Sequence, residues 1–464
     1  MLFNSYTFIL AFLPVSLLLF YMVNRRCAKG GKLVLLLLSV IFVCCNGIYH
    51  GAVAVGSTLV NFVICKQMTG KREQQKGLLT LGILFNVVLL GIFKYIPLAG
   101  VPLSFPLGVS FYCFQQIAFL VDQYRESTPV TLMDYSLFAL FYPKAVQGPI
   151  PYGSELLPQF QQHSTGGFSF ERLSQSLYLF AIGLAKKVLV ADSFAIIADY
   201  GFEAVKTLTA FEALLTILAY SLQLYFDFSG YSDMAVAVGR MFGFELPVNF
   251  DSPYKAKNIT DFWRRWHITL SRFLTKYIYI PLGGNRKGVV RTCLNILIVY
   301  LVSGIWHGTG ATFLIWGLLH ALASIAYRLL KKFYDRIPNP IQWLTQFVFI
   351  NITWVFFRAS SLETAGMLLE RLWQGKWSFA INAELAESLL QPTFISVAAQ
   401  FLPVPVVVLL GFAGALGIVV FAKNSTERSR DFHPNIRSLC MTYLLLLISI
   451  LSLAGVSGFL YTNF

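Results

Sequence analysis

Residues 251–288 read DSPYKAKNITDFWRRWHITLSRFLTKYIYIPLGGNRKG, and residues 303–320 read SGIWHGTGATFLIWGLLH. Most of the chain is apolar, yet these two stretches hold three of its six histidines, His267, His307 and His320. Basic side chains are concentrated in the same region, at Lys255, Lys257, Arg264, Arg265, Arg272, Lys276, Arg286, Lys287 and Arg291. Because charged and titratable groups are unfavourable near a bilayer, such a concentration indicates a functional site.

The composition is that of an all-α polytopic membrane protein. The 464 residues are 56% hydrophobic and 12% charged, whereas soluble domains carry roughly 25% charged residues. The net charge of +14 fits a membrane protein whose basic loops stay in the cytoplasm. No basic tail or separate polar domain is present to bind nucleic acid, so no nucleic-acid partner is expected. We expect one integral membrane domain over residues 1–464, in contact with lipid.

Apolar runs of about 20 residues, the length that crosses a bilayer, recur along the chain. We expect about eleven to thirteen transmembrane helices, the first of them at residues 5–23. Basic clusters such as residues 25–32 alternate with nearly uncharged turns such as residues 46–51. Since basic loops stay in the cytoplasm, the N-terminus and the C-terminus are both expected outside it.

Two segments do not fit a simple membrane span. Residues 141–160, FYPKAVQGPIPYGSELLPQF, are interrupted by proline and glycine. Irregular backbone at membrane depth must be shielded by protein or line a cavity. This segment is therefore either enclosed by the protein or an ordinary surface loop. Residues 361–391 are too polar to cross the bilayer and are expected to form an interfacial segment.

A single amphipathic helix is predicted over residues 260–277, with Asn258 or Thr260 as its cap. At about 100° per residue one face carries Phe262, Trp266, Leu270, Phe273 and Tyr277. The opposite face carries Arg264, Arg265, Arg272 and Lys276. Such a helix lies at the membrane interface, with its basic side toward headgroups or cytoplasm. His267 falls at the edge of the aromatic face, and on this pattern alone it is an interfacial histidine.

His307 is predicted to lie deep in the bilayer, at a break between two apolar runs, residues 292–305 and 311–327. Glycines on both sides of it allow a substrate or another backbone to approach closely. A neutral histidine there can take a proton from an alcohol as a general base. The alternative is a structural histidine, which is how His320 is interpreted.

Asp227 and Asp233 lie among aromatic and small residues. An acid in an apolar helix usually has a basic partner, and Arg240 or the basic stretch downstream is the expected one. Asp227 is thus either structural or orients a catalytic group. No metal site is expected, because the HExxH and CxxC spacings are absent. The nucleophile pattern G-x-S-x-G is absent too.

These motifs resemble the membrane-bound O-acyltransferase (MBOAT) family, and most of all its bacterial branch of alginate O-acetyltransferases and D-alanyl transfer proteins. The resemblance rests on FWRRWHITLSRFLTKYIYIPLGG, residues 262–284, and on SGIWHGTGATFLIWGLLH. It extends to LGVSFYCFQQIAFLVDQYR (107–125), FYPKAVQGPI (141–150) and YFDFSGYSDMAVAVGRMFGFELPVNFDSPY (225–254). The core that carries these motifs is residues 105–330.

The resemblance implies a ring of helices with re-entrant or interfacial helices around a central tunnel. It places His307 in that tunnel as the catalytic base, and it assigns His267 to the second polar position, where it positions or polarises the acyl carbonyl. The tunnel would be shaped by Trp306, Ser303, Gly304 and Gly308. Further support for the site would come from Asp227, Asn249, Tyr254, Trp263 and Trp266.

The same resemblance implies an O-acyltransferase of the bacterial cytoplasmic membrane. An acyl group, expected to be acetyl, would leave a cytoplasmic donor such as acetyl-coenzyme A or an acyl-carrier protein. The acceptor would be a hydroxyl on an extracytoplasmic polysaccharide, on peptidoglycan or on a partner transferase. No permanently bound cofactor is expected. The anionic donor would be attracted by the basic residues Arg264, Arg265, Arg272 and Lys276.

Three alternatives stay open. D-alanyl transfer to teichoic acid would use the same chemistry with a different acyl group. A transporter or flippase would use its histidines as a proton relay, although no inverted repeat is visible in the sequence. A non-catalytic scaffold would not depend on His307 at all.

Overall fold

The computed structural model describes residues 1–68, 71–162, 167–378, 381–390, 394–455 and 458–460. Within these ranges the chain forms helices and no β-strand, which confirms the all-α membrane class. Seven of the described helices are long and apolar enough to cross a bilayer, fewer than the eleven to thirteen expected. They cover Thr7–Asn24, Ile48–Gln67, Arg72–Ala99, Gly288–His307, Ala311–Tyr334, Asn339–Arg358 and Val404–Phe421.

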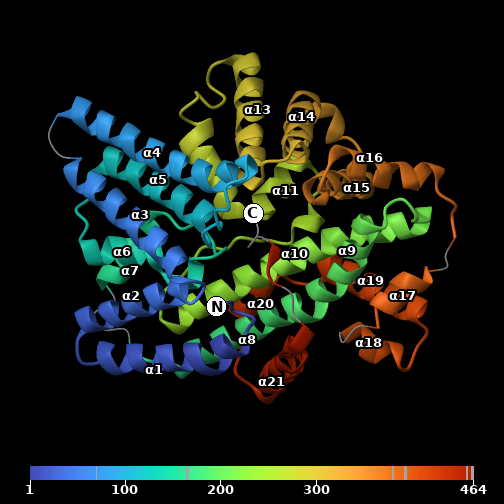
Figure 1. Ribbon diagram of the computed structural model, residues 1–464, viewed down its shortest axis with the longest axis horizontal. Coiled ribbons are helices and arrows are strands. Elements are labelled where there is room, and N and C mark those ends of the chain that lie inside the picture. Colours follow the sequence, from blue (N-terminus) through green and yellow to red (C-terminus); the bar gives the residue numbers. More distant parts are fainter. Residues whose placement is uncertain (69–70, 163–166, 379–380, 391–393, 456–457, 461–464) are drawn as a thin grey trace.

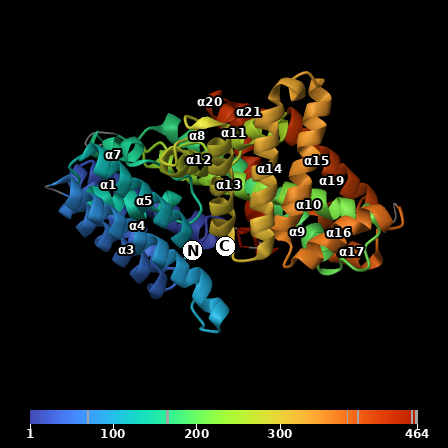
Figure 2. The same cartoon turned by 90° about the horizontal axis from the view of Figure 1, so that it is seen from above.

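The N-terminal helices form one side of the molecule (Figures 1 and 2). They are α1 (Leu13–Asn24), α2 (Ala28–Cys44), α3 (Ile48–Gln67), α4 (Arg72–Tyr95) and α5 (Val109–Glu126). Asn61 of α3 and Asn86 of α4 are buried and exchange side-chain hydrogen bonds of 2.7 and 3.3 Å. Such a pair satisfies both amides away from water and holds the two helices in register.

Residues 141–151 are enclosed by the protein, between α6 (Leu132–Leu140) and α7 (Gly153–Gln162). The ammonium of Lys144 is buried and donates to Gln115 Oε1 at 2.6 Å and to the Ala139 carbonyl at 3.1 Å. These hydrogen bonds offset part of the free-energy cost of removing the ammonium group from water. The surface-loop interpretation of this segment is therefore wrong, and the shielded one is confirmed.

Helix α10 (Ala210–Met241) runs through the middle of the molecule (Figure 1). It packs against α8 (Phe170–Ala185) and α9 (Asp192–Glu203). Its contact with α8 is close, because a Cβ on Gly230 would lie 2.7 Å from the Gly183 carbonyl oxygen. Only glycines permit that approach. The α10 helix therefore forms a rigid wall behind the histidine-bearing segments.

The predicted helix over residues 260–277 is broken in the structure. Helix α11 (Ile259–Arg265) begins at its predicted cap, where the Asn258 side chain accepts from the Asp261 N–H. After two residues the chain resumes as α12 (Ile268–Leu274), followed by a short π-helical turn, Thr275–Tyr279. The apolar face was predicted correctly, since Phe262, Trp266, Leu270 and Phe273 are buried.

Three long helices follow: α13 (Gly288–His307), α14 (Ala311–Tyr334) and α15 (Asn339–Arg358). Helices α13 and α14 form a hairpin beside the N-terminal group (Figure 2). The remaining helices are α16 (Leu362–Gln374), α17 (Ala383–Ser388), α18 (Phe394–Ala399), α19 (Val404–Phe421), α20 (Ser425–Arg430) and α21 (Ile436–Leu451).

The C-terminal third differs from expectation in one respect. The predicted interfacial segment 361–391 contains the amphipathic helix α16, which buries Ala365 and Leu368 and exposes Glu363 and Glu370. Its positions 379–380 and 391 lie outside the described residues. Helix α21 ends at Leu451, and Phe459 packs in the core 4.9 Å from the Tyr231 ring.

Candidate active site

His307 is the last residue of α13, as the predicted helix break required. Its side chain is only 4% exposed and lies among aromatic rings. The ring centroids of Trp306, Trp316 and Phe357 lie 4.7, 5.2 and 5.0 Å from that of His307. An imidazole held in an apolar aromatic setting favours its neutral form, which is the form a general base needs.

The glycines beside His307 allow α13 and α14 to pack closely against each other. A Cβ on Gly304 would lie 2.6 Å from the Phe313 carbonyl oxygen, and one on Gly308 would lie 2.1 Å from the Phe313 ring. Contacts that short do not occur, so Gly304, which faces backbone, requires glycine, whereas a side chain at Gly308 would require the Phe313 ring to move. Gly304 and Gly308 let the hairpin close and so fix His307, and their expected part in shaping the tunnel stays a prediction.

His267 forms the break between α11 and α12 and is buried, with 1% of its surface exposed. The interfacial interpretation of this histidine is therefore wrong. Its φ angle of 43° places it in the left-handed region, which non-glycine residues rarely adopt. Strained backbone of this kind persists where the surroundings impose it, and it is concentrated at functional sites.

Asn249 determines the protonation of the His267 ring. Its Oδ1 atom accepts from the Thr269 N–H at 3.2 Å and from the Thr269 hydroxyl at 3.0 Å. The same oxygen lies 3.0 Å from Nδ1 of His267. Because a carbonyl oxygen only accepts, Nδ1 carries the proton and the lone pair resides on Nε2. Among the described residues no group hydrogen-bonds to Nε2, and burial lowers the pKa of His267 to about 3.

Trp306 brings the two histidines into one site. Its ring centroid lies 6.3 Å from that of His267 and 4.7 Å from that of His307, and the two imidazoles interact electrostatically. The Trp306 ring also stacks on Phe114 at 5.1 Å. The fold thus assembles two basic ring nitrogens, from segments forty residues apart, around one tryptophan.

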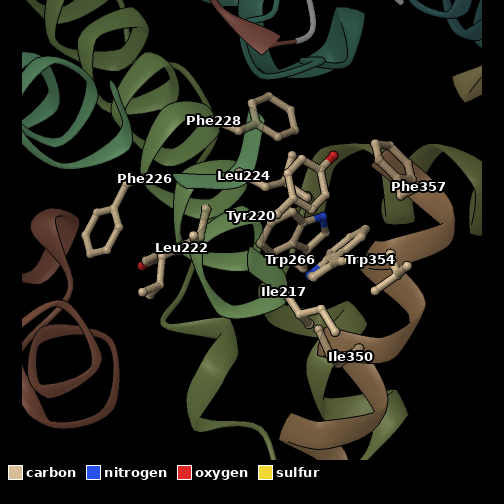
Figure 3. Packing of buried hydrophobic residues seen from close by; sticks show 14 of the residues in the cluster. Ile217, Tyr220, Leu222, Leu224, Phe226, Phe228, Trp266, Ile350, Trp354 and Phe357 are labelled. Atoms are coloured by element: carbon tan, nitrogen blue, oxygen red, sulfur yellow. The ribbon is translucent and has the colours of Figure 1, made fainter. Parts of the chain in front are cut away.

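The other aromatic residues expected at the site support these histidines from behind. Trp266 packs against Trp354 of α15 at 4.9 Å and against Phe250 at 5.1 Å, next to the side chains of α10 (Figure 3). The Tyr254 hydroxyl lies 2.7 Å from the Ser221 hydroxyl. Both residues hold the α11 region against α10.

His320 is a structural histidine, as predicted. The Trp263 Nε1–H donates to its Nδ1 at 3.3 Å, and its Nε2 lies 3.1 Å from the Thr353 hydroxyl. Since the indole nitrogen only donates, the His320 proton is on Nε2 and points to Thr353. The Thr353 hydroxyl in turn donates a hydrogen bond to the Ile350 carbonyl at 2.9 Å. Every polar atom of this buried network is satisfied, and it fixes Trp263.

Asp227 forms a salt bridge with Lys187, which was not among its predicted partners. Lys187 Nζ lies 2.7 Å from Asp227 and 2.8 Å from Asp192, and all three side chains are nearly buried. Asp233 pairs with Lys186 at 2.7 Å, whereas the expected partner Arg240 pairs with Glu245 at 2.8 Å. The partner prediction was therefore wrong, and the contacts of Asp227 indicate the structural role.

The basic face is largely neutralised by acids. Arg265 pairs with Asp261 at 2.8 Å, Arg272 with Glu155, and Lys276 with Asp122 at 3.0 Å. A salt bridge of this kind leaves little net charge to attract a distant anion. Three of the four basic residues expected to attract the donor are therefore paired with acids. The fourth, Arg264, is exposed.

A pocket of about 580 Å³ opens between α11, α12 and the α13–α14 hairpin. Its lining includes Trp263, Arg264, Arg272, Lys276, Ser303 and Arg328. Most of its surface is apolar, with the guanidinium and ammonium groups as its charged lining. Ser303 and His307 lie one helical turn apart on the same face of α13. The pocket therefore extends from basic side chains to within roughly 6 Å of rise of His307.

Lys94 is a site residue that sequence reasoning missed. It is buried and donates to the Trp306 carbonyl. A signal was present in the sequence, because apolar residues continue on both sides of Lys94 within the span Arg72–Ala99. A charge inside such a run is a functional-site hypothesis.

The comparison with known families agrees with this geometry. Residues 33–363 match the membrane-bound O-acyltransferase family. That range includes both histidines, Asn249 and the hairpin.

The chain belongs to the membrane-bound O-acyltransferase family. Its relatives include a peptidoglycan O-acetyltransferase of Helicobacter pylori, 41% identical over 80% of this chain and 79% of the relative. The probable alginate O-acetylase AlgI of Pseudomonas aeruginosa is 36% identical over 82% and 76%. A teichoic acid D-alanyltransferase of Bacillus subtilis is more distant, 27% identical over 51% and 62%.

The family and these relatives establish this chain as a membrane O-acyltransferase. The predicted resemblance is thereby confirmed, including its bacterial branch. The transporter and scaffold alternatives are set aside, because the relatives are named for covalent transfer.

Proposed function

We propose that this acyltransferase moves an acetyl group from a thioester donor on the cytoplasmic side of the bacterial cytoplasmic membrane to a hydroxyl outside it. The acceptor is a glycan of the cell envelope, with peptidoglycan favoured, or a partner transferase that passes the acetyl group on. The observation that carries this proposal is the pair of buried imidazoles at Trp306, one helical turn of α13 from a pocket lined with basic groups.

Two buried imidazoles that meet at one tryptophan suit acyl transfer to an alcohol. Nε2 of His267 is an acceptor in its tautomer, so it orients the incoming hydroxyl and cannot polarise the acyl carbonyl by donation. His307 takes the hydroxyl proton as the oxygen attacks the carbonyl carbon. The oxyanion then collapses, the carbon–sulfur bond breaks, and the thiolate leaves with the proton from His307. The products are the ester and the thiol.

The pocket suits a donor with a negatively charged head and an uncharged arm. Arg264 and Arg328 provide cations at its wall, and its apolar surface leads along α13 to Ser303. Acetyl-coenzyme A and an acyl-carrier protein share a phosphorylated arm that ends in a thioester, and both fit this description. Its volume lies in the range of about 300–1,000 Å³ typical of small-molecule sites.

The acetyl group and the envelope glycan are favoured by the names of the relatives. The O-acetyltransferase of Helicobacter pylori and AlgI match about four fifths of this chain at 36–41% identity. The D-alanyltransferase relative matches half of the chain at 27%. D-alanyl transfer to teichoic acid is therefore the second candidate, and it differs only in the acyl group.

The test compares ester-linked acetate and D-alanine on envelope polymers of cells that carry the wild type or His307→Ala at equal membrane abundance. We expect acetate to fall to the level of cells without the protein and D-alanine to stay unchanged. His433→Ala is the matched control, because His433 is exposed and distant in sequence from the site. Loss of D-alanine instead would select the second candidate, and no change in either ester would overturn the proposed function.

A further inference from the structure

Lys94 introduces a positive charge into the site from a helix that carries none of the family's histidine motifs. It lies near the end of α4, and its ammonium donates to the carbonyl oxygen of Trp306. That carbonyl belongs to the last turn of α13, directly before His307. Lys94 and His307 are close enough to interact electrostatically.

The burial of Lys94 is incompletely compensated by the protein. Its side chain is 9% exposed, and none of the ion pairs in the described part of the chain includes it. The Trp306 carbonyl is its one recorded hydrogen-bond partner among the described residues. An ammonium carries three donors, so two remain for another acceptor. The contrast is Lys144, which has two oxygen partners.

The chemistry of the site needs a donor for the acyl oxygen, and Lys94 supplies a cationic one. His307 acts as the base, and the tautomer of His267 makes its Nε2 an acceptor. His267 therefore presents no N–H to the acyl oxygen, and the role of His307 is to hold the hydroxyl proton until the thiolate leaves. A donor fixed beside the base, in a site shielded from water, is what that oxyanion requires.

We propose that Lys94 is a catalytic residue whose ammonium, anchored on the Trp306 carbonyl, binds the acyl oxygen of the thioester and stabilises the oxyanion. The acceptor oxygen forms its bond to the carbonyl carbon while its proton goes to His307, and the C=O electron pair moves to the oxygen beside Lys94. When that pair returns, the carbon–sulfur bond breaks and the thiolate takes the proton from His307. Lys94 keeps its own protons throughout. This role rests on the proposed function.

The experiment measures thiol release by the purified full chain from acetyl-coenzyme A and from fluoroacetyl-coenzyme A, with soluble peptidoglycan glycan fragments as the acceptor. The variants are Lys94→Met, which removes the charge, and Lys94→Arg, which keeps it. Lys76→Met is the control, because Lys76 is exposed on the same helix. We expect Lys94→Met to lower kcat for acetyl transfer by about 100-fold or more, with little change in KM for the donor. Lys94→Arg should recover much of that loss, and Lys76→Met should match the wild type.

The two donors separate catalysis from folding. Fluorine withdraws electrons and stabilises the oxyanion itself, so the loss in Lys94→Met should be several-fold smaller with the fluoroacetyl donor. Equal losses with both donors would show a merely structural lysine and overturn the proposal, as would a Lys94→Met variant with wild-type kcat. A wild type that releases thiol neither with the glycan fragments nor with a cell-envelope extract that contains the other acceptors would overturn the proposed function and this role together. An active wild type with an unaffected Lys94→Met would overturn only the role of Lys94.

Discussion

Asn249 holds Nδ1 of His267 at 3.0 Å, and its Oδ1 is itself held by the N–H and hydroxyl of Thr269. The Thr269 hydroxyl in turn accepts from the Ile150 N–H at 3.1 Å. The enclosed segment 141–151 is thereby joined to the histidine through two residues, Thr269 and Asn249. These hydrogen bonds hold two stretches of irregular backbone, the enclosed segment and the break at His267, next to each other.

Replacing Asn249 should impair transfer more than it impairs folding. Asn249→Ala removes the acceptor for Nδ1–H, so the ring can adopt the other tautomer and present N–H instead of a lone pair to the hydroxyl. We expect ester-linked acetate to form about 10–100-fold more slowly, an effect typical of residues that orient a functional histidine. Asn249→Asp keeps an acceptor and should be less impaired. Rates measured at equal membrane abundance decide the order, and an Asn249→Asp variant slower than Asn249→Ala would contradict it.

The Lys187–Asp227 pair should stabilise the fold rather than take part in chemistry. Lys187→Met would leave buried carboxylates without their cation and should cost about 3–5 kcal/mol of stability, seen as a lower Tm of the purified protein. The double variant Lys187→Met with Asp227→Leu should regain part of that loss, together with activity. A double variant that regains Tm but stays inactive would show that Asp227 contributes to the site after all.

Gly304 should tolerate no side chain. A Cβ there would meet the Phe313 carbonyl oxygen at 2.6 Å, and backbone cannot move aside as a side chain can. We expect Gly304→Ala to cost about 1–3 kcal/mol and to displace His307, so that Tm and transfer rate fall together. Gly91→Ala is the control, because a Cβ at Gly91 has no neighbour within 4 Å. Similar Tm values for the two variants would disprove the packing argument.

His267 should make the protein less stable as the pH falls. Burial lowers its pKa from 6.5 to about 3. Between those values the unfolded chain binds a proton at this position and the folded chain does not, so acid favours unfolding by about 1.4 kcal/mol per pH unit. Above pH 6.5 the effect vanishes. The Tm difference between the wild type and His267→Asn should therefore shift against the wild type from pH 6.5 downward, and a constant difference would refute the assignment.

Much of the site was predictable from local sequence. Asn258 was one of two predicted caps, the glycines around His307 indicated a break, and four of the five residues predicted for the apolar face of 262–277 are buried. Each of these depends on residues within one or two helical turns. Helical periodicity and capping express such short-range preferences, and a single sequence displays them directly.

The partners of charged residues were not predictable in this way. Asp227 pairs with Lys187 instead of Arg240, the basic face is neutralised by Glu155 and Asp122, and Lys94 reaches Trp306 across 212 positions. Many pairings of an acid with a base would be electrostatically favourable, because the attraction depends on distance. Only the packing of the helices decides which two groups come close.

The sequence by itself determined the class of this protein: apolar runs that need a bilayer, a chain of helices, and a histidine at a glycine-rich break. Only the tertiary structure decided what the site is. In the folded protein the helix is broken at His267, Asn249 sets the tautomer of the His267 ring, and Lys94 lies beside His307. Helix formation is satisfied within a segment, whereas the tautomer of a ring and the position of a charge depend on atoms that distant segments supply.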